Sequence, residues 1–384
     1  MKEGAGLPFV IEAEEVNRRH EASGLSLEAF LATLLEPTRS LARTPISNFN
    51  VGAVGLGSSG RVFRGVNVEF SGVPLNFSIH AEQFLIANAA RNGEHRLQFI
   101  AVSATPCGHC RQFLQELRGA GDIRIMIADE KPETAPLSHL LPHRFGPQDL
   151  LEDDFPLLLE TQFNNLHFPP LDALTVSKPT AIASSPSDEE LAGLLGGRSL
   201  NFSTGEVNGL SPADGLKGEQ DPKLADRNHA TLSHPVSSHL INSHALNSSC
   251  DGSLSPQQMG QLQQAAAEAR ELIELRNVAL EAANSSYSPY THSPSGLAFR
   301  TTQGGVYWGP YFESAAYNPS LPPLQTAIVA FVAEGGESFE EISKVVLVEK
   351  EGTTVRQAGV VRLALDQISP KASLQVFEAQ SQSC

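Results

Sequence analysis

The sequence predicts an α/β protein that contains two copies of one unit, each a mixed sheet covered by helices. Three observations lead to this prediction. Apolar residues change from helical to strand spacing at Phe49, the elements that follow have the order β-β-α-β-α-β, and the same glycine pattern returns 244 residues later. A chain of 384 residues is long enough for two domains that each bury a core.

The elements of the first unit follow from the spacing of its apolar residues. Helical spacing comes first, with an apolar face that includes Leu27, Phe30 and Leu31. Alternating residues then indicate two strands joined by the turn Gly57-Ser-Ser-Gly60. A final strand–helix–strand crossover indicates a mixed sheet. The predicted elements are a helical region at 10–43, strands at 49–55 and 61–69, helix 79–90, strand 96–103, helix 107–117 and strand 123–128.

A change in composition separates the two units. Between residues 177 and 256, Ser, Asn, Gly, Pro and His dominate and no hydrophobic period persists, so we expect a disordered or loosely ordered insertion. An amphipathic helix is predicted over 257–283, and strand-like sequence begins again at 289. Four histidines of the insertion recur every five residues, which suits neither a helix face nor a strand face; they are either solvated and incidental or scavenge metal weakly. These are His229, His234, His239 and His244.

The second strand-like region repeats the first without a gap. At an offset of 244 residues, glycines that turns require fall in register, which indicates two copies of one supersecondary unit. The matched residues are Pro45 with Pro289, Gly52 with Gly296, Gly60 with Gly304, Val62 with Val306, Gly65 with Gly309 and Glu69 with Glu313.

Charge and hydropathy exclude several classes of protein. The 43 acidic against 27 basic residues give a net charge of −16, and no basic stripe stands out, so a nucleic-acid partner is not expected. The apolar runs are far too short to span a membrane, and the acidic N-terminus lacks the apolar core of a signal peptide. Four cysteines are no disulfide framework: Cys250 is expected to be an exposed reduced thiol, and Cys384 either a buried end or a free thiol. These features predict a cytoplasmic protein.

Three residues of the first unit form a candidate metal centre. Cys107 and Cys110 are three residues apart at the start of a predicted helix, so both thiolates share one face. The positive end of the helix dipole favours the thiolate form that zinc requires, and His80 opens another predicted helix. Three protein ligands are typical of a catalytic zinc site, which keeps its fourth position for water. Glu82 lies two residues after His80 and is placed to move protons from that water.

Two other interpretations leave more of the sequence unexplained. Cys107-Gly-His-Cys110 is also the dithiol of disulfide isomerases, but that interpretation accounts for neither His80-Ala-Glu82 nor Asn67-Val-Glu69. In addition, Pro106 stands where those enzymes usually have a tryptophan. A purely structural zinc would need a fourth ligand, and His109 points away from the cysteine face of a regular helix. We therefore expect His109 to support the metal site rather than to ligate it.

The same motifs resemble those of cytidine deaminases. The resemblance rests on Ser47-Asn-Phe-Asn-Val-Gly52, His80-Ala-Glu-Gln83 and Thr105-Pro-Cys-Gly-His-Cys-Arg-Gln-Phe113, and H-x-E followed by P-C-x-x-C is the pattern of zinc-dependent nucleobase deaminases. The sequence is similar in particular to the dimeric form of plants and some bacteria, which has two deaminase-like domains per chain. The resemblance implies three-layer α/β/α domains with mixed sheets. The expected segments are an N-terminal segment at 1–24, a catalytic zinc-binding domain at 25–176, the insertion at 177–256 and a degenerate deaminase-like domain at 257–384.

The resemblance also implies a role for each residue of the site. His80, Cys107 and Cys110 would hold one zinc ion per chain. Glu82 would take a proton from the zinc-bound water, protonate the base and help ammonia to leave. The implied substrate contacts are Asn67, Val68 and Glu69 with the ribose, Phe49 with the pyrimidine ring, the Ala81 N–H with the base carbonyl and the Thr105 carbonyl with the leaving amine.

The implied reaction is the hydrolytic deamination of cytidine, and of deoxycytidine, to the uridine product and ammonia in pyrimidine salvage. A free nucleoside would be the ligand, without nucleic acid or membrane, and two chains would form a homodimer. Two alternatives stay open. One is a non-catalytic deaminase-like protein that binds nucleosides or partners; the other is a polynucleotide cytidine deaminase, against which the net charge of −16 and the ribose-binding pair argue.

The second unit lacks the metal ligands, and no C-x-x-C occurs after Cys110. The resemblance implies that this degenerate domain serves packing and helps to close the active site of the dimer partner. Glu313 and the loop Ser314–Pro319 are the candidates for that closure. The residues that meet at the offset of 244 are His80 with Leu324, Glu82 with Thr326 and Cys107 with Glu351.

Overall fold

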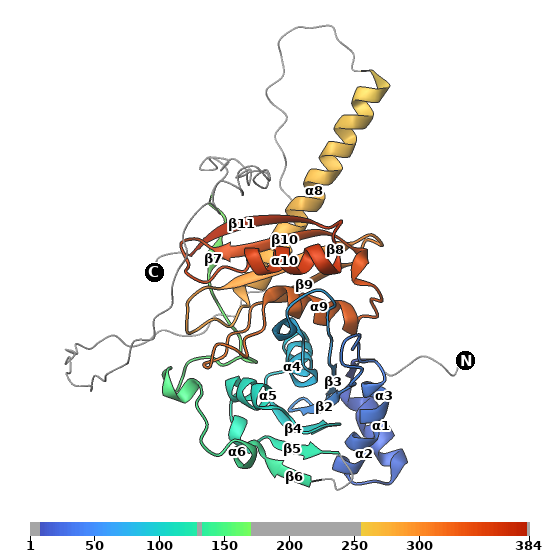
Figure 1. Ribbon diagram of the computed structural model, residues 1–384, viewed down its shortest axis with the longest axis vertical. Helices are drawn as coiled ribbons and strands as arrows, with labels where there is room; N and C mark the ends of the chain where they lie inside the picture. The colour runs from blue at the N-terminus through green and yellow to red at the C-terminus, as the bar shows by residue number, and fades with distance from the viewer. Residues whose placement is uncertain (1–7, 129–132, 170–254, 382–384) are drawn as a thin grey trace, which may run out of the picture. The chain divides into compact units, whose positions relative to one another are not determined.

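The computed structural model describes residues 8–128, 133–169 and 255–381. Residues 177–254 of the expected insertion, with its four spaced histidines and Cys250, lie outside these ranges, as does Cys384. Two sheets organise the described chain, and helices cover both faces of each (Figure 1). The predicted α/β class is therefore confirmed. None of the described helices combines the length and the apolar composition that crossing a membrane needs.

The first sheet contains β1 (Val10–Ile11), β2 (Gly52–Gly57), β3 (Val62–Val66), β4 (Leu97–Val102), β5 (Arg124–Ile127) and β6 (Glu133–Pro136). Its strand order is β1-β3-β2-β4-β5-β6. All neighbours are antiparallel except β4 and β5, which are parallel. The mixed sheet predicted from the strand–helix–strand crossover is thus confirmed.

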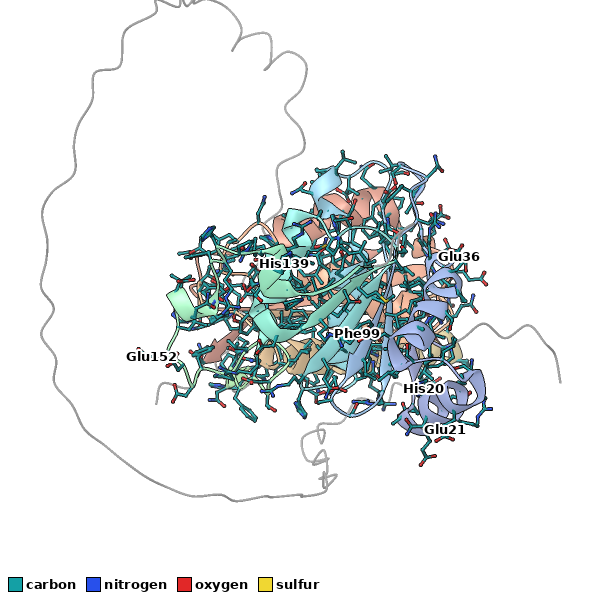
Figure 2. All side chains as sticks on the ribbon, turned by 90° about the horizontal axis from the view of Figure 1, so that it is seen from below. His20, Glu21, Glu36, Phe99, His139 and Glu152 are labelled. Carbon is teal, nitrogen blue, oxygen red and sulfur yellow. The ribbon has the colours of Figure 1, made fainter. Side chains whose placement is uncertain are left out.

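Two groups of helices cover the first sheet. One face is covered by α1 (Ala13–Ser23), α2 (Leu27–Thr33) and α3 (Leu35–Arg39). The other face is covered by α4 (Ala81–Arg91), α5 (Gly108–Phe113) and the short α6 (Leu137–Leu140). Phe99 lies between the sheet and α1–α3, whereas Glu21 and Glu36 lie at the surface (Figure 2). The helical region expected at 10–43 contains a strand and three separate helices. It divides because Gly24 adopts a left-handed conformation (φ 64°) and Ser26 caps the next helix.

The second sheet has the order β7-β11-β10-β8-β9. Its strands are β7 (Leu166–His167), β8 (Ser295–Thr301), β9 (Val306–Pro310), β10 (Ile342–Lys350) and β11 (Ser373–Ser381), and its helices are α8 (Pro256–Asn284), α9 (Pro323–Ala333) and α10 (Ala358–Ile368). Only β10 and β11 are parallel. Leu275, Ala279 and Ala283 of α8 pack on one face, and α9 and α10 cover the other. Each copy therefore has three layers.

The two copies match at an offset of 244 residues through their first hairpins. Ala53 pairs with Gly65 in the first hairpin, and Leu297 pairs with Gly309 in the second. Both glycines lie where a helix crosses the strand, because an added Cβ would lie 2.2 Å from the helix backbone in each copy. Glycine at these two positions is required by close packing of helix on strand.

The offset shortens to 242 residues at the helix that follows. His80 is the N-cap of α4 and Pro322 is the N-cap of α9, so these two residues correspond. The expected match of His80 with Leu324 is therefore wrong by two residues. The cause is a loop two residues shorter in the second copy, between backbone bridges at equivalent places. These bridges are Val68–Ile79 and Phe312–Leu321.

Helices α4 and α9 pack against each other between the two sheets (Figure 1), and one hydrophobic core runs through both copies. Two equivalent glutamines secure this contact. Gln83 donates a hydrogen bond to the Pro319 carbonyl (2.9 Å), and Gln325 donates one to the Phe77 carbonyl (2.6 Å). Each helix thus holds the loop that precedes the other, which gives the copies a reciprocal arrangement.

Candidate metal centre

The starts of two helices position the three candidate ligands. His80 is the N-cap of α4, Cys107 is the N-cap of α5, and Cys110 lies in the first turn of α5. The helix predicted over 107–117 begins one residue later, at Gly108, because Cys107 has an extended backbone (φ −70°, ψ 167°). After α5 the chain tightens into the 3₁₀ turn η2 (Leu114–Glu116). The spacing of three residues between the thiols is preserved.

The three side chains converge as a metal site requires. The Nδ1 atom of His80 lies 3.4 Å from the Cys107 sulfur and 3.3 Å from the Cys110 sulfur, and all three atoms lie within 4.8 Å of one another. Tetrahedral zinc, with its usual bond lengths, would separate nitrogen from sulfur by about 3.6 Å. The donor set therefore fits zinc. It is the single group of three such ligands found in the described part of the chain.

The charge on the thiols also suits a cation. Hydrogen bonds from Cys110 and His80 lower the pKa of the Cys107 thiol to about 3. The same bond to Cys107, together with burial, raises the pKa of Cys110. The pair thus holds one thiolate that faces the imidazole, and a divalent cation would stabilise the second thiolate as well.

Glu82 and His109 flank the ligands. The Glu82 side chain is 4% exposed, hydrogen-bonds Cys110, and has a pKa that burial raises. A raised pKa suits a carboxyl group that must both accept and donate a proton near neutral pH. His109 stacks on the His80 ring with centroids 5.0 Å apart and belongs to no ligand group. This position agrees with the expectation that His109 supports the site.

A cavity of about 460 Å³ opens beside the metal centre. A volume of this size falls in the range of small-molecule sites. Phe49, 59% exposed, stands at its edge and is therefore not a core residue. Seven other residues proposed from sequence line it with Phe49: Asn67, Glu69, His80, Ala81, Glu82, Thr105 and Cys107.

Asn67 and Glu69 also hold the edge of the cavity together. Asn67 donates a hydrogen bond to the Phe49 carbonyl (2.9 Å). Glu69 accepts from the backbone N–H groups of Ile46 and Ser47, at 3.0 Å each, and from the Ser47 hydroxyl (2.5 Å). The two polar side chains that the resemblance assigns to ribose are therefore fixed in place before any ligand binds.

Ala81 lines the cavity, Val68 does not, and Ile46 and Leu75 line it although they were not proposed from sequence. As the first residue of α4, Ala81 has an N–H without an acceptor inside the helix. Val68 does not reach the cavity, since its side chain is fully buried in the core. Leu75 and Ile46 line the cavity but were not predicted. Leu75 begins a single 3₁₀ turn, Leu75–Phe77, which is too short to show a hydrophobic period. The sequence signal nearest to these two residues is the Ser47 motif, which adjoins Ile46.

The second copy keeps the loop brace but not the ligands. Glu313 accepts hydrogen bonds from the backbone N–H groups of Tyr290 (2.9 Å) and Thr291 (3.2 Å), as Glu69 does from the residues 244 positions earlier. Glu313 is 1% exposed. The expectation that it reaches a dimer partner is therefore wrong, because its side chain is buried within its own copy.

Comparisons with known proteins agree with this geometry. Two family profiles match residues 26–126 and 221–362, and both are described as the cytidine and deoxycytidylate deaminase zinc-binding region. Cytidine deaminase 1 of Arabidopsis thaliana is 39% identical over 96% of this chain and 97% of its own. Cytidine deaminase 6 of the same plant is 38% identical over 90% of each. The cytidine deaminase of Sodalis glossinidius is 32% identical over 90% of this chain and 82% of its own.

These matches span nearly the whole chain, and the first profile contains all three candidate ligands. The resemblance read from the motifs is confirmed, and with it the zinc cofactor, for which His80, Cys107 and Cys110 provide one site per chain. The isomerase-type dithiol is excluded by the same matches. The chain belongs to the cytidine deaminase family.

Proposed function

We propose that this protein hydrolyses cytidine and deoxycytidine to the corresponding uridine nucleoside and ammonia. One observation carries the proposal: a buried glutamate, Glu82, adjoins a three-ligand zinc site on the wall of a cavity of about 460 Å³. Three protein ligands leave a zinc coordination position for water or substrate, as catalytic sites do and structural sites do not. The names of the relatives, all cytidine deaminases, support the same substrate.

His80, Cys107 and Cys110 hold the zinc, which supplies the Lewis acidity that lowers the pKa of a water molecule. Glu82 accepts the proton of that water, because it is the carboxylate beside the ligands. It then donates this proton to N3 of the pyrimidine, and afterwards transfers the second proton, from the hydroxyl group added at C4, to N4, so that the amine leaves as ammonia. Water adds to C4 and the C4–N4 bond breaks, so cytidine and water give uridine and ammonia.

The remaining cavity residues orient the nucleoside. The free N–H of Ala81 binds the base carbonyl, the Thr105 carbonyl faces the amine, and Phe49 packs on the ring. Asn67 and Glu69 bind ribose hydroxyls while they brace the loop, since each carboxylate oxygen has more than one acceptor site. The 2′-hydroxyl has no dedicated contact in this assignment, which is why both cytidine and deoxycytidine are included.

We further propose a cytoplasmic homodimer that acts in pyrimidine salvage. Ile46, Phe49 and Leu75 at the cavity edge are 44%, 59% and 71% exposed, and an exposed apolar rim favours cover by another chain. The loop Ser314–Pro319, in which Tyr317 is 62% exposed, is the candidate cover. The domain limits 25–176 and 257–384 are proposed with it. A variant that lacks residues 177–255 should keep zinc and activity.

The direct test is ammonia release from cytidine, deoxycytidine, the monophosphates, adenosine and single-stranded DNA. The proposal expects turnover of the two cytosine nucleosides. Preference for a monophosphate would refute the nucleoside assignment, because Glu69 repels phosphate. Glu82→Gln should keep zinc and nucleoside binding but lose nearly all turnover. A Glu82→Gln enzyme with normal turnover would overturn the mechanism, and sedimentation of the full chain as a monomer would overturn the dimer.

A further inference from the structure

A buried carboxylate outside the cavity joins the zinc helix to the second copy. Glu116 ends η2, the turn that continues α5, and its side chain is fully buried. One oxygen accepts the backbone N–H of Ala315 (2.7 Å). The other accepts the hydroxyls of Tyr290 (2.6 Å) and Tyr287 (3.0 Å). These three donors belong to the second copy.

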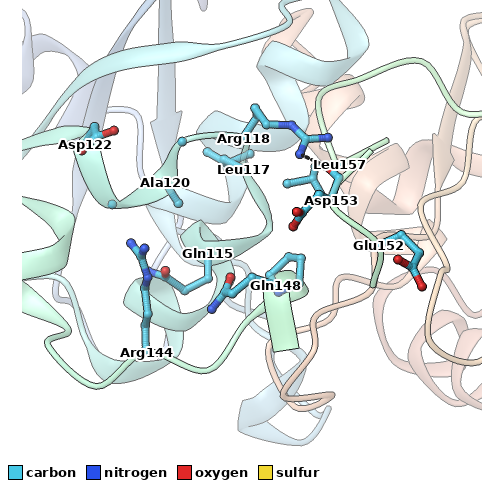
Figure 3. Close-up of a pocket in the computed structure, with 13 residues that line it drawn as sticks. Gln115, Leu117, Arg118, Ala120, Asp122, Arg144, Gln148, Glu152, Asp153 and Leu157 are labelled. Carbon is cyan, nitrogen blue, oxygen red and sulfur yellow. Dashed lines mark hydrogen bonds between the residues drawn. The ribbon is translucent and has the colours of Figure 1, made fainter. Parts of the chain in front are cut away.

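Burial of a carboxylate costs free energy of desolvation, which hydrogen bonds must offset. Burial raises the pKa of Glu116, while the tyrosine and backbone donors oppose that effect. A carboxylate kept out of water persists only where hydrogen bonds satisfy it. Its neighbours Gln115 and Leu117 line a separate polar cavity of about 210 Å³ (Figure 3), and Glu116 is not among the residues that line it. The Glu116 carboxylate therefore faces the other copy rather than a pocket of its own.

The loop that Glu116 holds is also fixed at its other end. Ala315 bonds Glu116, and the Pro319 carbonyl accepts from Gln83 (2.9 Å). Gln83 follows Glu82 in α4, and its side-chain oxygen accepts the His80 N–H (3.2 Å). One loop of the second copy is thus attached to both helices that carry the zinc ligands.

We propose that Glu116 is a positioning residue for the zinc site, an inference that rests on the proposed function. By anchoring Ala315, Tyr287 and Tyr290, Glu116 fixes α5 against the second copy, and Gln83 fixes α4 against the same loop. The distance between His80 and the two cysteines is then set through the second copy. This gives the degenerate domain a role within its own chain, distinct from cover of a partner's cavity.

The test compares Glu116→Gln with a matched control, Glu94→Gln. Glu94 is 2% exposed and accepts hydrogen bonds from the hydroxyls of Ser58 (2.8 Å) and Ser59. It is therefore a buried, braced carboxylate, and its other donors, the backbone N–H groups of His95 and Arg96, also lie in the first copy. Both variants should lose thermal stability. Only Glu116→Gln should release zinc to a chelating dye about 10-fold faster and lose about 10-fold in kcat, with KM little changed. Equal zinc release from the two variants would refute the proposal.

A milder variant keeps the proposal testable if Glu116→Gln does not fold. Tyr290→Phe removes one donor and should accelerate zinc release by a smaller factor. Zinc release from Tyr290→Phe no faster than from the unmodified protein would refute the proposal even without Glu116→Gln. Where Glu116→Gln does fold, the effect of Tyr290→Phe should disappear in the double variant, because the two residues act as one unit. Independent, additive effects would refute the coupling. Zinc release is measured without nucleoside, so this result stands apart from the outcome of the cytidine assay.

Discussion

The exchange of Gly65 for alanine tests how closely the position of α4 controls catalysis. Gly65 lies in β3 below the first turn of α4. An added Cβ would lie 2.2 Å from the Ala81 carbonyl oxygen and 2.5 Å from the Leu85 nitrogen, where ordinary contacts begin at 3.4 Å. Both obstacles are backbone atoms, so no side chain can turn aside. The start of α4, with His80 and Glu82, must move by about 1 Å.

The expected magnitudes follow from this displacement. Overpacking of a core costs about 1–3 kcal/mol, and obstruction by backbone places Gly65→Ala near 3 kcal/mol. For a body of this size that corresponds to a fall in Tm of roughly 5–10 °C. A displacement of about 1 Å in a catalytic group lowers kcat by about 100-fold. Calorimetry and ammonia release measure the two effects.

Two alanine variants provide controls. Gly296→Ala places a Cβ 2.1 Å from the Ala283 nitrogen of α8, a helix without site residues, so it should lose similar stability and little kcat. Gly108 lies between the two cysteine ligands, yet its Cβ position is open. Gly108→Ala should therefore change neither property greatly. Normal kcat in Gly65→Ala, or equal kcat losses in Gly65→Ala and Gly296→Ala, would refute the reasoning.

Three further predictions concern zinc, substrate and pH. Cys110→Ala should bind almost no zinc, measured by metal analysis, and its Tm should no longer respond to a chelator, unlike that of the unmodified protein. Phe49→Ala should raise KM about 3- to 10-fold and leave Tm nearly unchanged, since the ring is mostly exposed. The hydrogen bond from Arg118 lowers the pKa of Glu160. The stability lost in Glu160→Gln should therefore be constant at neutral pH. It should shrink as the pH falls below the ordinary glutamate pKa of about 4, because the unfolded chain takes up the proton there while the native carboxylate, with its lower pKa, is still charged.

The parts of the fold that sequence predicted are those in which local spacing and tertiary packing agree. The hairpins and α4 were found because period, turn glycines and helix packing indicate the same elements. The helical region at 10–43 was not resolved into its parts, because its leucine spacing continues past the break at Gly24 and Ser26. The zinc ligands were predicted because three residue types at fixed spacing are needed to bind the ion. The loop brace by Glu69 has no such pattern.

The two copies show why the zinc site could be lost without loss of the fold. Glu69 and Glu313 brace equivalent loops, so this acid serves the architecture whether or not zinc is present. The ligands, in contrast, lie at helix starts that accept other residues. Pro322 takes the place of His80 at the start of α9, and Gln357 is the N-cap of α10.

Tyr311 takes the position of Asn67 in the second copy: the Asn67 N–H bonds the Val51 carbonyl, and the Tyr311 N–H bonds the Ser295 carbonyl 244 residues later. It is buried and hydrogen-bonds Gln357 and Ser320, and burial raises its pKa to about 12. Uncharged side chains, those of Pro322, Gln357 and Tyr311, thus lie around the equivalent helix starts. Because both copies share one hydrophobic core, the second copy could lose its zinc ligands and still keep the surface that α4 and Glu116 contact. The second copy then contributes to catalysis through the geometry that it imposes on the first.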